Sequence, residues 1–457
     1  MAQQDSHLNF ESEPIKTLFR KIFFPTLLGL FFGVLLNVAD GIFVGRGVGS
    51  DALAAVNIAA PIFLIMSGVA MLLGSGASVV MAIHLGKGNV KAARINMTLA
   101  VVVAFLLQLG FVLIFCTFSE QTCYLFGGSD RLMHLFKDYL FGIAAGTVVF
   151  PIAMVGMFVI RLDGSPKLAS SIQVTGCVLN IFLDWLFVFP LGLGIAGAAW
   201  ATAISCIIET LITVTYFLFF SKTLKPCMLS LNADAVISYI RNVINIAKLG
   251  FSTFLGEMAI TGIMITGNYG FMELLGEDGV AAFSVACYLL PMVFMIGQAI
   301  VQSAQPIISF NYGKHLWDRI AQTRTLAFTL ALVLGLLLMV VGIFSTPIIA
   351  GLFLEPCPAY DIACQGLPIF SIVFLFFTLC VVGIGYYQSL EFAKQATLFT
   401  LLRGFIFVIP AFILLPRWLG VNGLWLAMPL SEILTLIVMF VTYTLKKDPA
   451  KKLQEKL

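Results

Sequence analysis

Long apolar runs recur along this chain, and they limit its possible folds more than any other feature. A membrane-spanning helix needs about 20 predominantly apolar residues. We identify twelve such runs, at 22–45, 53–83, 96–118, 139–160, 168–190, 195–220, 243–271, 280–310, 323–348, 366–390, 395–415 and 421–445. Within a bilayer each run must satisfy its own backbone hydrogen bonds, which predicts an α-helix for all of them. Only 11% of the residues are charged, so we expect an all-α polytopic membrane protein.

The distribution of basic residues tests the count of twelve spans. If both termini are cytoplasmic, the outward-facing loops carry only four of the 26 Lys and Arg residues: Arg46, Arg131, Lys137 and Arg417. The remainder lie on the cytoplasmic side, including those of the tail "KKDPAKKLQEKL". A missing or additional span would scramble this asymmetry, so the positive-inside rule supports twelve spans. We expect a multi-pass protein of the inner cell membrane. Residues 1–16 lack the apolar core of a cleavable signal peptide, so the first span is expected to remain as an anchor.

The two halves of the chain resemble each other at a nearly constant offset. At an offset of 227, Gly49, Asp51, Ala54, Ala55, Gly86, Lys87, Lys167 and Ala169 match Gly276, Asp278, Ala281, Ala282, Gly313, Lys314, Lys394 and Ala396. At 226, Pro190, Gly194, Gly197 and Ser205 match Pro416, Gly420, Gly423 and Ser431. Parallel repeats of this kind are typical of transporters that bind substrate between their halves. We therefore predict two pseudo-symmetric six-helix lobes, at 1–220 and 243–457, joined by a cytoplasmic linker at 221–242 that includes a surface helix.

Motifs of enzymatic chemistry are missing from the sequence. It has no P-loop, GxSxG or HExxH motif, and its nine Cys and four His residues show no metal-ligand spacing. We therefore expect no enzyme activity and no cofactor. Cys357 and Cys364 share one outer loop, where they could form a disulfide or remain free thiols.

Ionisable residues within membrane helices are costly, which makes them functional candidates. Asp40, Asp184 and Thr202 lie five to seven residues inside the outer ends of their spans. At 1.5 Å per residue they share a depth of roughly 8–11 Å below the outer edge of the hydrocarbon. These three residues are therefore expected to lie at one level of the N-terminal lobe.

Polar neighbours accompany them at helical spacing. Asn37 precedes Asp40 by three residues, Asn180 precedes Asp184 by four, and Ser205 follows Thr202 by three. Spacings of three and four place each pair on one helix face. Two carboxylates in a low-dielectric cavity cannot easily both ionise, so one of them is expected to hold a proton. The same oxygens suit Na⁺, and the sequence does not choose between the two ions.

Several longer stretches resemble one transporter family. They are "NVADGIFVGRGVGSDALAA", "HLGKGN", "RLDGSPKLASSIQVTGCVLNIFLDWLFVFPLGLGIAGAAWAT" and "QPIISFNYGK", which cover both halves in order. The chain resembles the MATE (multidrug and toxic compound extrusion) family, and within it the bacterial branch of DinF-like and MepA-like pumps. The resemblance implies the MATE fold, with an alternating cavity and efflux driven by inward H⁺ or Na⁺. It also implies that Asp40, Asn180 and Asp184 form the coupling site, with Thr202 nearby.

The C-terminal lobe has different acidic residues. At the repeat offsets, Asp40 and Asp184 match Gly267 and Pro410, so this lobe lacks the carboxylate pair. Glu257 matches an acid that NorM-type members of the family use, but Gln388 stands near the place of its expected partner. We expect substrate contacts or secondary cation ligands at Asn37, Ser205, Glu257, Gln388 and Glu432. Glu209, deeper than Thr202 in its span, is equally consistent with a structural role.

These observations favour a secondary active multidrug antiporter that exports amphipathic, cationic organic compounds. A carboxylate cannot bind a cationic drug and a proton well at the same time, and that competition would couple the two fluxes.

One alternative is a lipid-linked oligosaccharide flippase, which needs a basic cavity; Lys248 and Arg403 are its only candidates within spans. The second alternative is a channel. The expected partners are small organic molecules and the lipid bilayer, with no nucleic acid, and the expected state is a monomer.

Overall fold

The computed structural model describes residues 8–445, 450 and 454, apart from 127 and 231. Within these residues every regular element is a helix. The basic tail at 446–457 falls almost entirely outside them. The elements are α1 (Ile15–Gly47), α2 (Ser50–Gly86), α3 (Val90–Thr117), α4 (Ser119–Leu125), α5 (Met133–Leu162), α6 (Pro166–Val188), α7 (Gly194–Thr215), η1 (Tyr216–Phe220), α8 (Ala233–Gly313), α9 (Trp317–Phe344), α10 (Thr346–Phe353), α11 (Pro358–Ser371), α12 (Val373–Ser389), α13 (Ala393–Leu401), η2 (Leu402–Ile406), α14 (Val408–Leu419) and α15 (Val421–Leu445).

The helices agree with the predicted spans. Across the described residues, ten helices are long and apolar enough to cross a membrane, and the bent pair of α11 and α12 adds another span. The helix α8 has 81 residues, about 120 Å at 1.5 Å per residue, whereas a bilayer core is about 30 Å thick. Its non-helical residue Gly276 (φ 64°, ψ −151°) divides it into two helices. Counting α8 as two accounts for the twelve predicted spans.

The chain divides into two compact units. The first comprises residues 1–13 and 20–250, and the second comprises 14–19 and 251–457. The predicted linker at 221–242 therefore belongs to the first unit. Its helical part begins at Ala233 and continues without interruption into the first span of α8.

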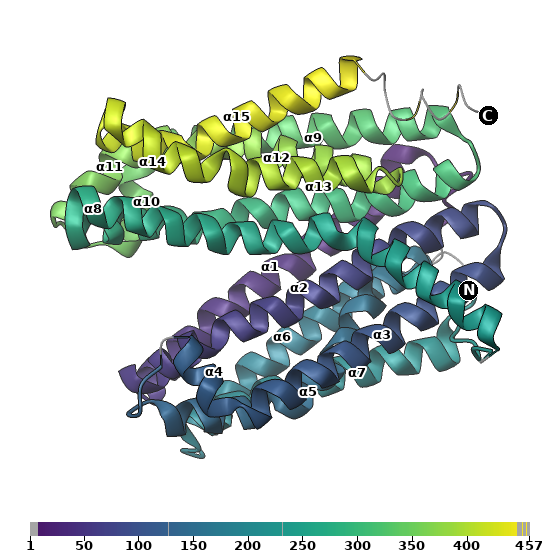
Figure 1. The fold of residues 1–457 in the computed structure, drawn as a ribbon, viewed down its shortest axis with the longest axis horizontal. Coiled ribbons are helices and arrows are strands. Elements are labelled where there is room, and N and C mark those ends of the chain that lie inside the picture. Colours follow the sequence, from purple (N-terminus) through teal and green to yellow (C-terminus); the bar gives the residue numbers. More distant parts are fainter. Residues whose placement is uncertain (1–7, 127, 231, 446–449, 451–453, 455–457) are drawn as a thin grey trace. The chain divides into compact units, whose positions relative to one another are not determined.

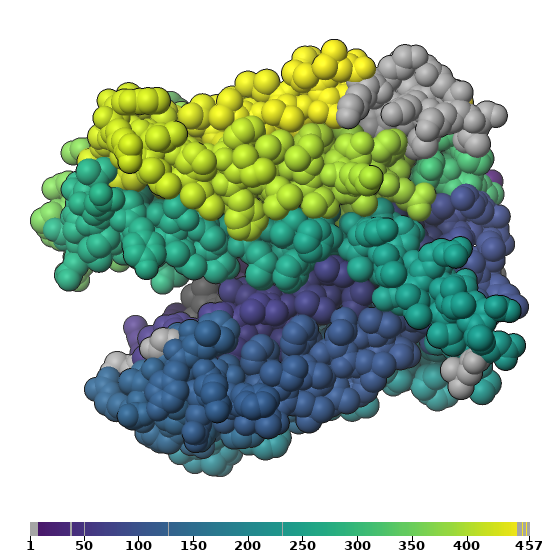
Figure 2. Space-filling view, viewed as in Figure 1, coloured from purple at the N-terminus to yellow at the C-terminus, as the bar shows by residue number. Residues whose placement is uncertain are grey.

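The first unit is packed through small residues. Gly142 of α5 lies against Ala199 of α7, where an added Cβ would be 2.6 Å from the Ala199 Cβ. One turn further, a Cβ on Gly146 would be 2.3 Å from the Ala203 Cα. Small residues at four-residue spacing let membrane helices approach closely. Figure 1 shows α5 and α7 running side by side, and Figure 2 shows one face of this unit, with the residues of α5 in blue. The contact with α5 fixes the rotation of α7 and therefore determines which of its side chains face α6.

The second unit has an aromatic core. Phe271 stacks on Phe283 with ring centroids 4.6 Å apart, and its centroid lies 4.7 Å from that of Trp425 on α15. Trp425 lies directly on Gly366, where an added Cβ would be 1.9 Å from its ring. Gly267, the counterpart of Asp40, lies against the ring of Phe283 in the same way, at 2.4 Å. The core thus fills the place that the carboxylate takes in the first unit.

Turns at equivalent places of the two halves share an uncommon backbone conformation. Positive φ angles occur at Gly49, Gly88, Gly164 and Gly194, and again at Gly276, His315, Glu391 and Gly420. Each pair is separated by one of the two repeat offsets, 227 or 226 residues. Because His and Glu rarely adopt this conformation, its retention indicates that the repeat preserves backbone geometry even where Gly has been replaced.

One of these turns gives a stability prediction. Gly88→Ala is expected to lower the free energy of unfolding by about 1 kcal/mol, because φ is 75° and a Cβ is strained there although it meets no other atom within 4 Å. Gly110→Ala is the control, since its Cβ also meets nothing within 4 Å but the residue lies inside the helix α3. Thermal unfolding of the purified protein in detergent measures both. If Gly88→Ala unfolds at the same temperature as Gly110→Ala, the strain at this turn is refuted.

Candidate functional site

Two carboxylates meet in the first unit, near the C-terminal ends of α1 and α6. The helix ends are held together at Gly47, where an added Cβ would be 2.2 Å from Val188 Cγ1. Asp40 and Asp184 lie on the preceding turns, and their side chains interact electrostatically. Asp184 is fully buried, and Oδ1 of each aspartate is buried without a hydrogen-bond partner among the described residues. Buried carboxylate oxygens of this kind require a proton or a cation.

Asn180 connects Asp184 to α7. With its amide assigned from the hydrogen-bond network, Nδ2 donates to Asp184 Oδ2 at 3.0 Å. Its Oδ1 then lies 3.1 Å from the backbone N of Thr202 and 3.2 Å from Thr202 Oγ1, and it accepts from both. Asn180 is itself buried, 3% exposed. The structure therefore brings four of the predicted coupling residues, Asp40, Asn180, Asp184 and Thr202, into one cluster.

Two further residues were predicted beside this cluster. Ser205 is buried on α7, and its hydroxyl donates to the backbone O of Ala201 at 2.9 Å. This bond within the helix occupies the hydroxyl proton. The side chain of Asn37 lies outside the described part of the structure.

Tyr139 on α5 belongs to the cluster, although the sequence reasoning missed it. Its buried hydroxyl interacts electrostatically with Asp40 and Asp184. The fourth span was predicted to start at 139, whereas α5 begins at Met133. With the correct start, Tyr139 is about 9 Å inside the helix, which is the depth of the aspartates. The polar residues of the stretch "MHLFKDY" placed the predicted start of the span at Tyr139, so the depth of this residue was not recognised.

The acid of α15 in the second unit has a basic partner. Arg403 donates to Glu432 Oε1 from Nε at 3.0 Å and from Nη2 at 2.8 Å. Both side chains are buried, and the guanidinium also stacks over the Phe377 ring, 4.1 Å from its centroid. The structure thus places Glu432 in an ion pair rather than alone in its span. Oε2 of Glu432 is buried and has no partner among the described residues.

Gln388 lines a small polar cavity in the second unit, together with Arg403 and Ser252. Its Nε2 donates to Thr253 Oγ1 at 3.2 Å. Glu257 lies one turn beyond Thr253 on α8, but it is not among the residues that line this cavity.

Cys357 and Cys364 are both free thiols.

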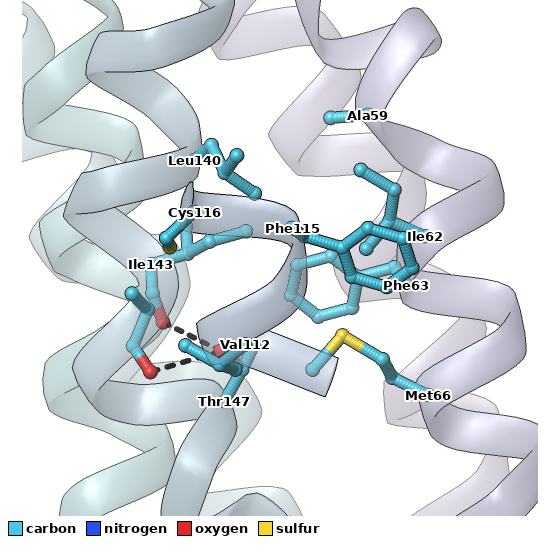
Figure 3. A pocket seen from close by; sticks show the side chains of 11 residues that line it. Ala59, Ile62, Phe63, Met66, Val112, Phe115, Cys116, Leu140, Ile143 and Thr147 are labelled. Atoms are coloured by element: carbon cyan, nitrogen blue, oxygen red, sulfur yellow. Dashed lines mark hydrogen bonds between the residues drawn. The ribbon is translucent and has the colours of Figure 1, made fainter. Parts of the chain in front are cut away.

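A second, small cavity lies between α2, α3 and α5 (Figure 3). Apolar side chains such as Phe63, Met66 and Phe115 surround it. The hydroxyl of Thr147 points back to its own helix, 3.1 Å from the backbone O of Ile143. This cavity is therefore mainly apolar, and it holds none of the predicted site residues.

Comparison with known proteins identifies the family. The sequence profile of the MatE family matches residues 25–186 and 253–413, one segment in each half of the chain. The chain belongs to the MatE family. The family pattern occurs twice in this MATE protein, which agrees with the internal repeat.

Curated relatives of this MATE protein match nearly its whole length. It is 23% identical over 441 residues to a protein named multidrug export protein MepA from Staphylococcus saprophyticus, covering 92% of each chain. It is 25% identical over 436 residues to a protein named FAD transporter from Shewanella oneidensis, covering 93% of each. The predicted resemblance to the family is confirmed, and the MepA relatives agree with the predicted bacterial branch.

Solved structures share the fold. A multidrug resistance MATE family transporter of the MOP superfamily superposes with a TM-score of 0.89, at 20% identity and 97% coverage of this chain and 98% of the other. A MATE transporter from Vibrio cholerae gives 0.87, at 20% identity and 94% and 96% coverage. The predicted MATE fold is confirmed. The protein is a multi-pass membrane protein of a family that includes multidrug exporters.

Proposed function

We propose that this protein is a secondary active antiporter that exports amphipathic organic cations in exchange for inward H⁺. The observation that carries the proposal is the pair of neighbouring aspartates, Asp40 and Asp184, each with a buried oxygen that lacks a partner in the described residues. The difference between the two halves of the chain supports the proposal as well. The counterpart of Asp40 in the second unit is Gly267, which lies against an aromatic ring.

Competition at this pair would couple the two fluxes. Asp40 and Asp184 repel each other when both are ionised, so a cation or a proton stabilises them and the two compete. Asn180 donates to one oxygen of Asp184 and leaves the other available. Protonation from the predicted outer end then displaces the cationic drug, and loss of the proton on the cytoplasmic side restores its binding.

H⁺ is favoured over Na⁺ by the ligand geometry. Hard cations prefer several oxygen ligands around them. The Asn180 oxygen is turned toward the two donors of Thr202 and away from the carboxylates. A proton needs only a single carboxylate oxygen, which both aspartates supply. Na⁺ is the second candidate, because carboxylate oxygens are also suitable ligands for it.

The flippase alternative has weaker support. It requires a basic cavity, and Arg403 is paired with Glu432, so its charge is largely neutralised.

A nucleotide-containing substrate has one specific observation in its favour. The polar cavity of the second unit offers the hydrogen-bonding side chains of Gln388 and Ser252, and one relative is named FAD transporter.

Transport in proteoliposomes tests the coupling ion. Under an imposed pH gradient without Na⁺, we expect movement of a cationic dye, and under a Na⁺ gradient at equal pH we expect none. FAD is added as a competitor in a parallel arm. Transport driven by Na⁺ alone would contradict H⁺ coupling, and inhibition by FAD would favour the nucleotide substrate over organic cations.

A further inference from the structure

A third carboxylate lies deeper in the first unit, and the proposed coupling site does not use it. Glu209 follows Thr202 by seven residues on α7, about 10 Å along the helix. Its carboxylate packs against Gly176 of α6, where an added Cβ would be 1.7 Å from Glu209 Oε1. No Lys, Arg or His in the described part of the chain forms an ion pair with Glu209. It is therefore an acid between two membrane helices, and it has no basic partner in the part of the chain that the structure describes.

Polar groups connect Glu209 to the aspartate pair. The buried Tyr139 interacts electrostatically with Asp40, Asp184 and Cys206. Cys206 of α7 interacts in turn with Glu209, and so does Cys177 of α6. Within the described residues, the titratable groups beside Glu209 are therefore Cys177 on the neighbouring helix α6 and Cys206 on α7 itself. Hydroxyl and thiol groups can both donate and accept a hydrogen bond, so Tyr139 and the two thiols place polar groups between the aspartate pair and Glu209.

The polar column continues beyond Glu209, toward the end predicted to be cytoplasmic. Thr213 lies one turn further on α7, fully buried, and its Oγ1 has no partner within the described residues. On α6, Asp184 and Asn180 are followed at helical spacing by Cys177, Gln173 and Ser170. Ser170 Oγ and Gln173 Oε1 are likewise buried without partners in this part of the chain.

The helix α1 closes the column on its third side. Gly29 lies so near Gln173 that an added Cβ would be 2.5 Å from Gln173 Oε1. Thr26, one turn earlier on α1, is fully buried, and its Oγ1 has no partner among the described residues. Buried polar atoms without partners are rare in native proteins and call for an explanation. Here they lie on α1, α6 and α7, on the side of Glu209 that is predicted to be cytoplasmic, and Thr213 also packs against Gly156 of α5.

We propose that Glu209 is a second proton-exchanging carboxylate, which relays protons between the Asp40–Asp184 pair and the predicted cytoplasmic end of the first unit. This inference rests on the H⁺ coupling of the proposed function. One proton leaves the carboxylic acid of the aspartate pair and one arrives on the Glu209 carboxylate. The pair becomes anionic and able to bind a cation, and Glu209 becomes neutral. Release of the proton toward the cytoplasm then restores Glu209.

Glu209→Gln in proteoliposomes tests this role, because it keeps the shape and removes the titratable group. The first assay measures tetraphenylphosphonium transport driven by a pH gradient. The second measures exchange of labelled for unlabelled tetraphenylphosphonium at equal pH, which needs no net proton transfer. We expect pH-driven transport to fall on the order of 100-fold while exchange is unchanged, since an acid–base group of this kind accelerates proton transfer by about that factor.

Two further variants control the result. Glu209→Asp keeps a carboxyl group and should restore part of the pH-driven transport. Glu120→Gln, an exposed carboxylate of the same unit with 62% of its side chain accessible, should behave as the wild type. If Glu209→Gln keeps full pH-driven transport, or if it loses exchange in equal measure, the relay is refuted while the coupling site stands. If the wild type itself exchanges dye but shows no pH-driven transport, the proposed H⁺ coupling fails, and the relay with it.

Discussion

Asp184→Asn is expected to reduce pH-driven dye transport to the level of liposomes without protein. The substitution removes the charge and leaves the volume and the contact with Asn180 in place. Because Asp184 is fully buried and shares its site with Asp40, the remaining carboxylate no longer experiences a neighbouring charge. Competition between drug and proton, which requires that pair, is then lost.

Asp40→Asn should have the same effect, and the double variant should be no worse than either single one. Residues that act as a unit give non-additive losses. Asp51→Asn, at an exposed carboxylate paired with Arg131 in the same unit, is the control and should transport normally. Full activity in both single variants would contradict the coupling site, provided that their helix content and size-exclusion profiles match the wild type.

The second large effect concerns stability. Glu432→Met is expected to lower the free energy of unfolding by about 3–5 kcal/mol, because it leaves the buried guanidinium of Arg403 without its partner. The double variant Arg403→Met/Glu432→Met should recover most of that loss, since apolar residues of similar size often replace a buried pair without cost. Thermal unfolding in detergent measures both variants.

An exposed ion pair provides the comparison. Lys137 and Glu120 lie 2.6 Å apart with much of both side chains accessible, and breaking such a pair is expected to cost under about 1 kcal/mol. If Glu432→Met were as mild as Glu120→Met, or if the double variant were as unstable as Glu432→Met, the structural role of the buried pair would be refuted.

The fold was largely predictable because the bilayer leaves few choices. Apolar length and the distribution of basic residues determined the spans, and the repeat divided them into two halves. The division of the predicted span at 395–415 was harder to foresee. Arg403 interrupts it, and in the structure the chain there forms η2 between α13 and α14. The partner that makes this arginine tolerable, Glu432, lies on another helix, and its contact cannot be read from spacing along the chain.

The candidate site was predictable in part for a similar reason. Common depth and helical spacing placed Asp40, Asp184 and Thr202 at one level, and the structure brings them together. Tyr139 was missed because the start of its helix was placed six residues too late. The orientation of Asn180, which supports H⁺ over Na⁺, depends on contacts of two helices with each other. Such contacts depend on close packing, as at Gly176 of α6 against Glu209 of α7, and hydropathy does not report them.

Proton release on substrate binding is the most direct test of coupling at the aspartate pair. Tetraphenylphosphonium is added to the purified protein in weakly buffered detergent, and the pH is followed with an indicator dye. We expect the wild type to release protons as it binds the cation, and the Asp40→Asn/Asp184→Asn variant to release none. Binding to the wild type without proton release, or equal release from the double variant, would contradict exchange of H⁺ and drug at Asp40 and Asp184.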